Sequence, residues 1–91
     1  MITLYDCLIP SPHTASDTLE DQVIIIDVIT GSYFSLNSTG AFLWERLDGQ
    51  TSLGTIAEEL AEKFDADPAQ TRSDVLELAV HLMEEGLVEK V

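Results

Sequence analysis

The hydrophobic residues in the first half of the chain follow patterns that predict β-strands. Two runs rich in β-branched and aliphatic residues, Ile2 to Ile9 and Gln22 to Val28, are bounded by Pro, Ser and Asp and predict two strands. A third strand is expected over Tyr33 to Leu36, because the preceding Thr30-Gly31 supplies the positive φ that a tight hairpin needs. Such a short strand suits the edge of a sheet, and residues 10–21 are expected to form a loop.

The second half of the chain predicts three helices. Residues 38–48 form a helix that is apolar around nearly its whole circumference, so it must be buried, with Trp44 in the core. Residues 52–64 carry apolar side chains on one helical face and acidic ones on the other. Residues 68–85 begin with proline and end before Gly86, which are start and stop signals. The sequence therefore predicts an α+β fold with a winged helix-turn-helix layout, a three-stranded antiparallel sheet followed by three helices.

The third predicted helix carries more apolar surface than one core contact requires. At about 100° per residue, two neighbouring stripes cover about 200° of its circumference, whereas one core contact needs a little over about 100°. The tighter stripe is expected to face the core and the other to face outwards, although two neighbouring elements that bury both stripes are an equally open interpretation. The first stripe consists of Val75, Leu78, Ala79 and Leu82, and the second of Leu76, Val80, Met83 and the flanking Leu87.

The composition indicates one small folded domain with an acidic surface. The 91 residues are 45% hydrophobic, and 17 Asp and Glu against 4 Lys and Arg give a formal net charge of −13. Such a surface repels the phosphate backbone of nucleic acids and attracts basic partners. The longest aliphatic run, Val23 to Ile26, is far too short to cross a bilayer, and a lone Cys7 fits a reducing compartment. We therefore expect a soluble cytoplasmic protein with no nucleic-acid or membrane partner.

Residues that carry chemistry are sparse. Cys7, His13 and His81 are the only soft metal ligands, and none of them belongs to a metal-binding or Cys/His motif. Ser52, near a predicted helix start, superficially suggests the phosphopantetheine site of a carrier protein, but carrier proteins are all-helical and the predicted strands contradict that interpretation. The sequence predicts a binding protein that is not an enzyme and uses no cofactor or metal.

Two segments of the sequence resemble the PqqD-like family. They are TGSYFSLNSTGAFLWERLDGQTSLGTIAEEL and FDADPAQTRSDVLELAVHLMEEGLV, and the resemblance covers Gln22 to Val88. Its diagnostic parts include the hairpin at Thr30-Gly31, the helix start at Thr39-Gly40, the aromatic Trp44 and the turn at Asp48-Gly49. Members of this family are recognition elements for the precursors of ribosomally synthesised and post-translationally modified peptides (RiPPs).

The resemblance implies that the chain binds the leader region of a precursor peptide and presents it to a modifying enzyme. In the family, the leader adds to the third strand and docks against the third helix. Strand addition draws affinity from main-chain hydrogen bonds and selectivity from side-chain pockets. The expected peptide-binding residues are Tyr33, Phe34, Ser35 and Leu36 on the strand and Leu76, Ala79, Val80 and Met83 on the helix.

The resemblance leaves several pathways open. The pattern is most similar to the stand-alone leader-binding proteins of lasso-peptide biosynthesis, whose partner is a leader peptidase of cysteine-protease type. The main alternative is PqqD proper, which delivers its peptide to a radical SAM enzyme, and another radical SAM maturation system is a third. A plain interaction domain without a peptide substrate is a further interpretation.

The acidic composition generates a prediction about nucleic acids. A mobility-shift assay at low salt, where non-specific binding is strongest, should show no retardation of duplex DNA by this protein. A duplex that is retarded at micromolar protein would contradict the inference from charge.

Overall fold

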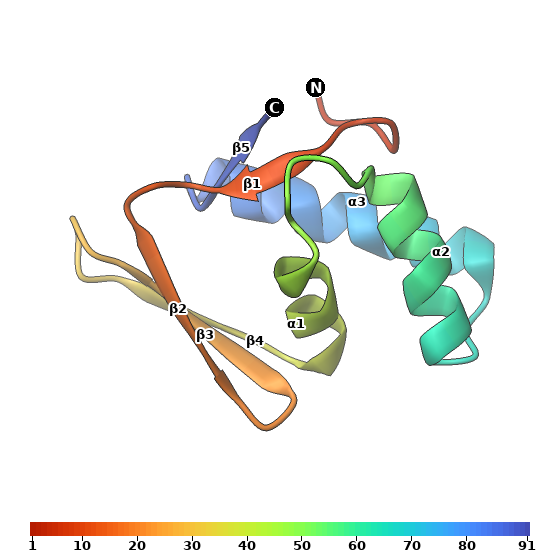
Figure 1. Ribbon diagram of the computed structural model, residues 1–91, viewed down its shortest axis with the longest axis horizontal. Helices are drawn as coiled ribbons and strands as arrows, with labels where there is room; N and C mark the ends of the chain where they lie inside the picture. Colours follow the sequence, from red (N-terminus) through yellow and green to blue (C-terminus); the bar gives the residue numbers. More distant parts are fainter.

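The structure is a computed structural model that describes residues 1–91 and contains five strands and three helices (Figure 1). In chain order they are β1 (Leu8–Pro10), β2 (Thr14–Leu19), β3 (Gln22–Asp27), β4 (Tyr33–Leu36), α1 (Ser38–Glu45), α2 (Leu53–Lys63), α3 (Pro68–Glu84) and β5 (Val88–Lys90). The strands β2, β3 and β4 form an antiparallel sheet in that order, and β1 pairs with β5 in a separate two-stranded sheet. The predicted α+β class, with a three-stranded antiparallel sheet and three helices, is confirmed.

The N-terminal segment is mostly not the strand that the sequence predicted. Asp6 closes a turn by accepting a hydrogen bond from the Thr3 N–H at 2.7 Å, so only Leu8–Pro10 becomes a strand. The segment then meets the start of α2, where the N–H of Gly54 donates to the Leu4 carbonyl at 2.8 Å. Because the first N–H groups of a helix have no partner within it, this contact ties the N-terminal segment to α2.

The strand that completes the sheet comes from the residues predicted as a loop. Thr14–Leu19 forms β2 and pairs with β3 along its whole length, from Thr14 opposite Asp27 to Leu19 opposite Gln22. The sequence of β2, TASDTL, is largely polar and its side chains are nearly all exposed, because the strand projects beyond the core. It therefore lacks the alternation of apolar and polar residues that marks a half-buried strand.

The three helices each begin at a side-chain cap, as their sequences favour. The cap oxygens accept hydrogen bonds from the N–H groups of the first turn: Asn37 from Gly40 at 3.1 Å, Ser52 from Thr55 at 3.2 Å and Asp67 from Gln70 at 3.3 Å. The helices start at or next to the residues expected from the sequence and end one to three residues earlier than expected. No helix combines the length and the apolar character that a bilayer crossing requires.

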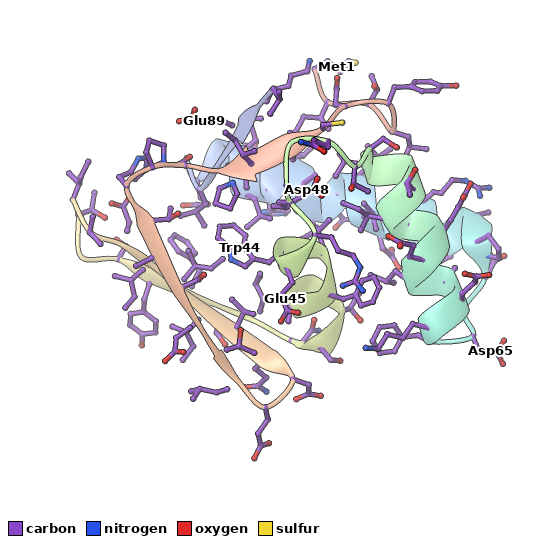
Figure 2. All side chains as sticks on the ribbon, viewed as in Figure 1. Met1, Trp44, Glu45, Asp48, Asp65 and Glu89 are labelled. Atoms are coloured by element: carbon purple, nitrogen blue, oxygen red, sulfur yellow. The ribbon has the colours of Figure 1, made fainter.

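The core lies between the three helices and one face of the β2–β3–β4 sheet (Figure 1). The sheet contributes Val23 and Ile25, which are 1% and 0% exposed. Trp44 is 6% exposed and its side chain points from α1 into the interior beside the sheet (Figure 2), so its predicted core position is confirmed. Leu87, which the sequence placed in the outward stripe, is fully buried and belongs to the core instead. A short segment after the helix turns this residue inwards, which a helical wheel does not anticipate.

The burial of Trp44 predicts a large effect on stability. Replacing Trp44 with Ala should lower the free energy of unfolding by about 3–5 kcal/mol, because the small side chain leaves a cavity among the neighbouring core residues. Chemical denaturation followed by circular dichroism measures this, with Glu45→Ala as the exposed neighbouring control, which should change the free energy by less than about 0.5 kcal/mol. Equal stability of the two variants would contradict the packing described here.

Candidate functional site

The strand β4 leaves one side of its backbone without a partner. It is the terminal strand of the sheet and pairs only with β3, with Phe34 opposite Ile25 and Ser35 opposite Ile24. The Asp27 N–H donates to the Ser32 carbonyl at 2.9 Å, so Asp27 and Ser32 form a hydrogen-bonded pair between the two strands. This pair determines which residues of β4 hydrogen-bond to β3. In an antiparallel pair, alternate residues point their N–H and C=O groups at the partner strand. The groups of Phe34 and Leu36 therefore face β3, and those of Tyr33 and Ser35 face the open edge.

The turn before β4 holds the start of this strand in place. The Asp27 Oδ1 accepts hydrogen bonds from the N–H groups of Ile29 at 2.9 Å and Thr30 at 3.2 Å. The hydrogen bond from Thr30, with a smaller contribution from the bond donated by Ile29, holds the pKa of Asp27 below its usual range. His13, whose Nε2 lies 3.8 Å from the Asp27 Oδ2, lowers this pKa as well. Gly31 takes φ +80°, a left-handed conformation that a residue with a side chain rarely adopts.

The end of β4 is held by its direct passage into α1. Asn37 follows the strand and caps the helix, so no loop separates the two elements. A Cβ at Gly40 would lie 3.0 Å from the Leu36 Cβ, which is closer than side chains normally approach. The glycine therefore allows α1 to pack tightly against the last residue of β4, and both ends of the strand are fixed.

The side chains of β4 alternate between the core and solvent. Phe34 and Leu36 are half-buried and pack against the core, whereas Tyr33 is 74% exposed and Ser35 is exposed. Any chain that pairs with the edge would therefore find two half-buried apolar side chains on one face of β4 and Tyr33 on the other.

The predicted outward stripe of α3 does line an apolar groove. A cavity of about 690 Å³ is bounded by Val80 and Met83 on one side and by Met1, Ile2 and β5 on the other. A neighbouring hollow of about 430 Å³ adds Leu76 to this surface. Met1 and Glu89, which border the larger cavity, lie at the end of the molecule that holds the two termini (Figure 2). We call this surface the terminal groove.

The two predicted halves of the site do not line a common cavity. No residue of β4 lines either cavity of the terminal groove. In Figure 1 the two termini and β5 lie above α3, whereas β4 lies below it. Ala79, expected to contact the peptide, is 0% exposed and part of the core, so its small side chain does not reach the surface.

The flank of α3 opposite the terminal groove is a second candidate for contact with a peptide on β4. A helical wheel places Leu78 and His81 across the buried stripe of Val75 and Ala79 from Val80. Leu78 is half-buried against the core, and it lines a shallow hollow of about 240 Å³ together with Asp74, Glu77 and His81. The sequence pattern assigned Leu78 to the core face. The polar His81 one turn away was the signal that this side of the helix reaches the surface.

The surroundings of this flank are acidic. Asp74 and Glu77 border the hollow at Leu78, and His81 is exposed. No cluster of three or more His, Cys, Asp or Glu side chains is placed to hold a metal ion. The site can offer backbone hydrogen bonds, apolar side chains and negative charge, which are the means of binding a peptide.

Comparisons with known proteins identify relatives of this arrangement. A family model for the coenzyme PQQ synthesis protein D (PqqD) matches residues 22–88. Over 44 residues, the chain is 48% identical to the PqqA binding protein of Xanthomonas oryzae pv. oryzae strain PXO99A and 50% identical to that of Xanthomonas euvesicatoria pv. vesicatoria strain 85-10. Each match covers 48% of this chain and 48% of the relative, so it spans about half the length of these proteins.

Two solved structures share the fold at low sequence identity. Lasso peptide synthetase B1 complexed with the leader peptide gives a TM-score of 0.82 at 22% identity, over 90% of this chain and 96% of that chain. The PqqD truncation of Methylobacterium extorquens PqqCD, a stand-alone RiPP recognition element, gives 0.80 at 20% identity, over 98% and 95%. Because the family model spans most of the sequence, from the start of β3 to the start of β5, the chain belongs to the PqqD family.

Proposed function

We propose that this chain binds the leader region of a ribosomally synthesised precursor peptide and presents the peptide to a modifying enzyme. The observation that carries the proposal is the open edge of β4, whose unpaired backbone groups at Tyr33 and Ser35 are held in place from both ends of the strand. The fold shared with the B1 protein and the PqqD recognition element supports it.

The leader would bind by adding a fourth strand to the sheet. Tyr33 and Ser35 each offer one N–H and one C=O, so a peptide that runs along β4 gains up to four main-chain hydrogen bonds. Each bond contributes about 0.5–1.5 kcal/mol net, which gives useful affinity without any dependence on the peptide sequence. The rigid placement of β4 lowers the entropic cost of binding, since only the peptide must be ordered.

The edge of β4 is a better receptor than the other edge of the sheet. The strand β2 is polar and projects into solvent, which is how proteins protect an edge from unwanted pairing. In Figure 1, β4 and α3 both recede to the rear of the molecule, whereas β2 lies at the front. A peptide on β4 would therefore run beside a helix that can contact its side chains, and a peptide on β2 would not.

The flank of α3 that carries Leu78 suggests which leader sequences fit beside β4. Leu78 offers an apolar contact, and Asp74 and Glu77 border it with negative charge. We therefore favour a leader that places an apolar residue towards Leu78 and carries Lys or Arg nearby. The net charge of −13 would also speed the arrival of such a peptide.

Two pathways are candidates for the peptide that binds. The hairpin and helix-start pattern favours a lasso precursor handed to a leader peptidase, in keeping with the fold shared with lasso peptide synthetase B1. The higher sequence identity to the PqqA binding proteins favours a PqqA-type precursor handed to a radical SAM enzyme. Calorimetric titration with one leader of each class separates them, since only the cognate leader should bind at micromolar concentration or below.

Strand addition predicts that a proline at Ser35 blocks binding. Ser35→Pro removes the outward N–H and places the proline ring where the leader strand must lie, while the hydrogen bonds between β4 and β3 stay intact. The affinity for the cognate leader should fall at least about tenfold, which corresponds to about 1.4 kcal/mol. Calorimetry measures this.

Ser35→Ala is the matched control for that variant. It removes the same hydroxyl but keeps the backbone N–H, so it should bind the leader as the parent does. Circular dichroism should show both variants folded. If Ser35→Pro is folded and binds like Ser35→Ala, the leader does not pair with β4.

The placement of α3 predicts which methyl groups sense the leader. In a methyl-labelled sample, addition of the leader should shift the signals of Leu78 and leave those of Val80 and Met83 unchanged, because the latter line the terminal groove on the other side of α3. The reverse result would place the peptide in the terminal groove, where the outward stripe expected from the sequence lies.

A further inference from the structure

The central strand of the sheet is apolar on both faces, but only one face is covered. The inward side chains Val23 and Ile25 are fully buried, whereas Ile24 is half-buried and Ile26 is 44% exposed on the other face. All three helices lie on the same side of the sheet (Figure 1). A strand that is apolar on both faces is typical of a sheet covered on both sides, whereas a solvated face is normally polar. The outer face of β3 therefore carries apolar side chains that no helix of the chain covers.

The uncovered face gathers much of the exposed apolar surface of the molecule. Of the ten large hydrophobic residues that are exposed, five lie in this sheet and its turns: Leu19, Ile26, Val28, Ile29 and Tyr33. The pairing places Ala15, Ile26 and Tyr33 in one row across the three strands. We call the surface formed by Ile24, Ile26, Val28, Tyr33, Ala15 and Leu19 the outer sheet face. Ile24 lies between the polar Asp17 and Ser35, and Leu19 lies opposite Gln22, so the apolar part of this face is centred on the row of Ala15, Ile26 and Tyr33. An exposed apolar patch of this kind marks an interaction site.

The charges around the outer sheet face indicate what covers it. The chain has no Lys or Arg before Arg46, so β2, β3 and β4 contain no basic residue. Asp17 lies opposite Ile24 on this face, and Glu20 and Asp21 form the adjoining turn. A second copy of the chain would bring the same uncompensated carboxylates together, and each copy has a net charge of −13. The complementary surface is one with an apolar centre and a basic rim.

We propose that the outer sheet face docks the modifying enzyme, through a surface on the enzyme that is apolar with Lys and Arg at its border. The identity of this partner rests on the proposed function. Tyr33 connects the two surfaces, because its backbone faces the open edge of β4 and its side chain lies on the outer sheet face. An enzyme that covers this face reaches the leader on the neighbouring edge, so peptide and enzyme bind side by side without competing.

The test uses a purified lasso leader peptidase and a purified radical SAM enzyme, each with its own leader, and continues with the enzyme whose leader binds the parent. Ile26→Thr keeps a β-branched side chain in the strand but makes it polar. Val80→Thr is the matched control, since Val80 is 42% exposed against 44% for Ile26 but lies on α3. Ile26→Thr should bind the leader like the parent and bind the enzyme at least about tenfold more weakly, as expected for a central interface residue. Val80→Thr should match the parent in both assays.

A charge variant tests the basic rim separately. Asp17→Lys should weaken the enzyme complex and reduce its sensitivity to salt, because it removes one attractive charge and adds a repulsive one. Leader affinity should be unchanged, since Asp17 lies on β2, away from the open edge of β4.

Each outcome bears on the proposal. Enzyme binding that is unchanged in Ile26→Thr overturns it, and so does loss of leader binding in that variant, since the face would then belong to the peptide site. A parent that sediments as a dimer, with the dimer lost in Ile26→Thr, shows that a second copy covers the face and also overturns it. Failure of the proposed function can be distinguished from failure of this inference, because the parent itself would then bind no leader.

Discussion

The packing of α1 against the inner face of the sheet is the contact on which the rest of the structure depends. Trp44 and Leu43 fill the space over Val23 and Ile25, and all four are buried in one core cluster. Gly40 lets the helix approach Leu36 closely, so that β4 passes into α1 without a loop. A short terminal strand is normally the part of a sheet that frays, but here both of its ends are fixed. The open edge of β4 is therefore rigid because the helix behind it is buried.

Much of the fold could be read from the sequence, because its strongest signals are local. The apolar patterns and the proline at the start of the third helix located the three helices, and the Thr30-Gly31 turn identified the β3–β4 hairpin. The apolar character of residues 38–48 required the burial that Trp44 shows. The errors occurred where tertiary pairing decides the structure. β2 is a strand only because β3 pairs with it, and Asp6 turns a segment whose apolar residues favour extension.

The candidate site was also predicted in part from the sequence. The sequence identified β4 as an edge strand, and the topology confirms this. It could not decide which flank of α3 lies beside that edge, because both stripes satisfy helical periodicity. The N-terminal segment and β5 border the Val80 and Met83 side of α3, whereas the hollow at Leu78 and His81 is lined by α3 residues alone. The contact of the N-terminal segment with α3 has no local signal in the sequence, since it joins residues from opposite ends of the chain.

The measurement that tests strand addition most directly is amide hydrogen exchange along β4 with and without the cognate leader. The amides of Phe34 and Leu36 already bond to β3, so they act as internal controls. Our account expects the leader to slow exchange at Tyr33 and Ser35 and to change Phe34 and Leu36 little. A leader that binds tightly and leaves the exchange of Tyr33 and Ser35 unchanged would contradict the account.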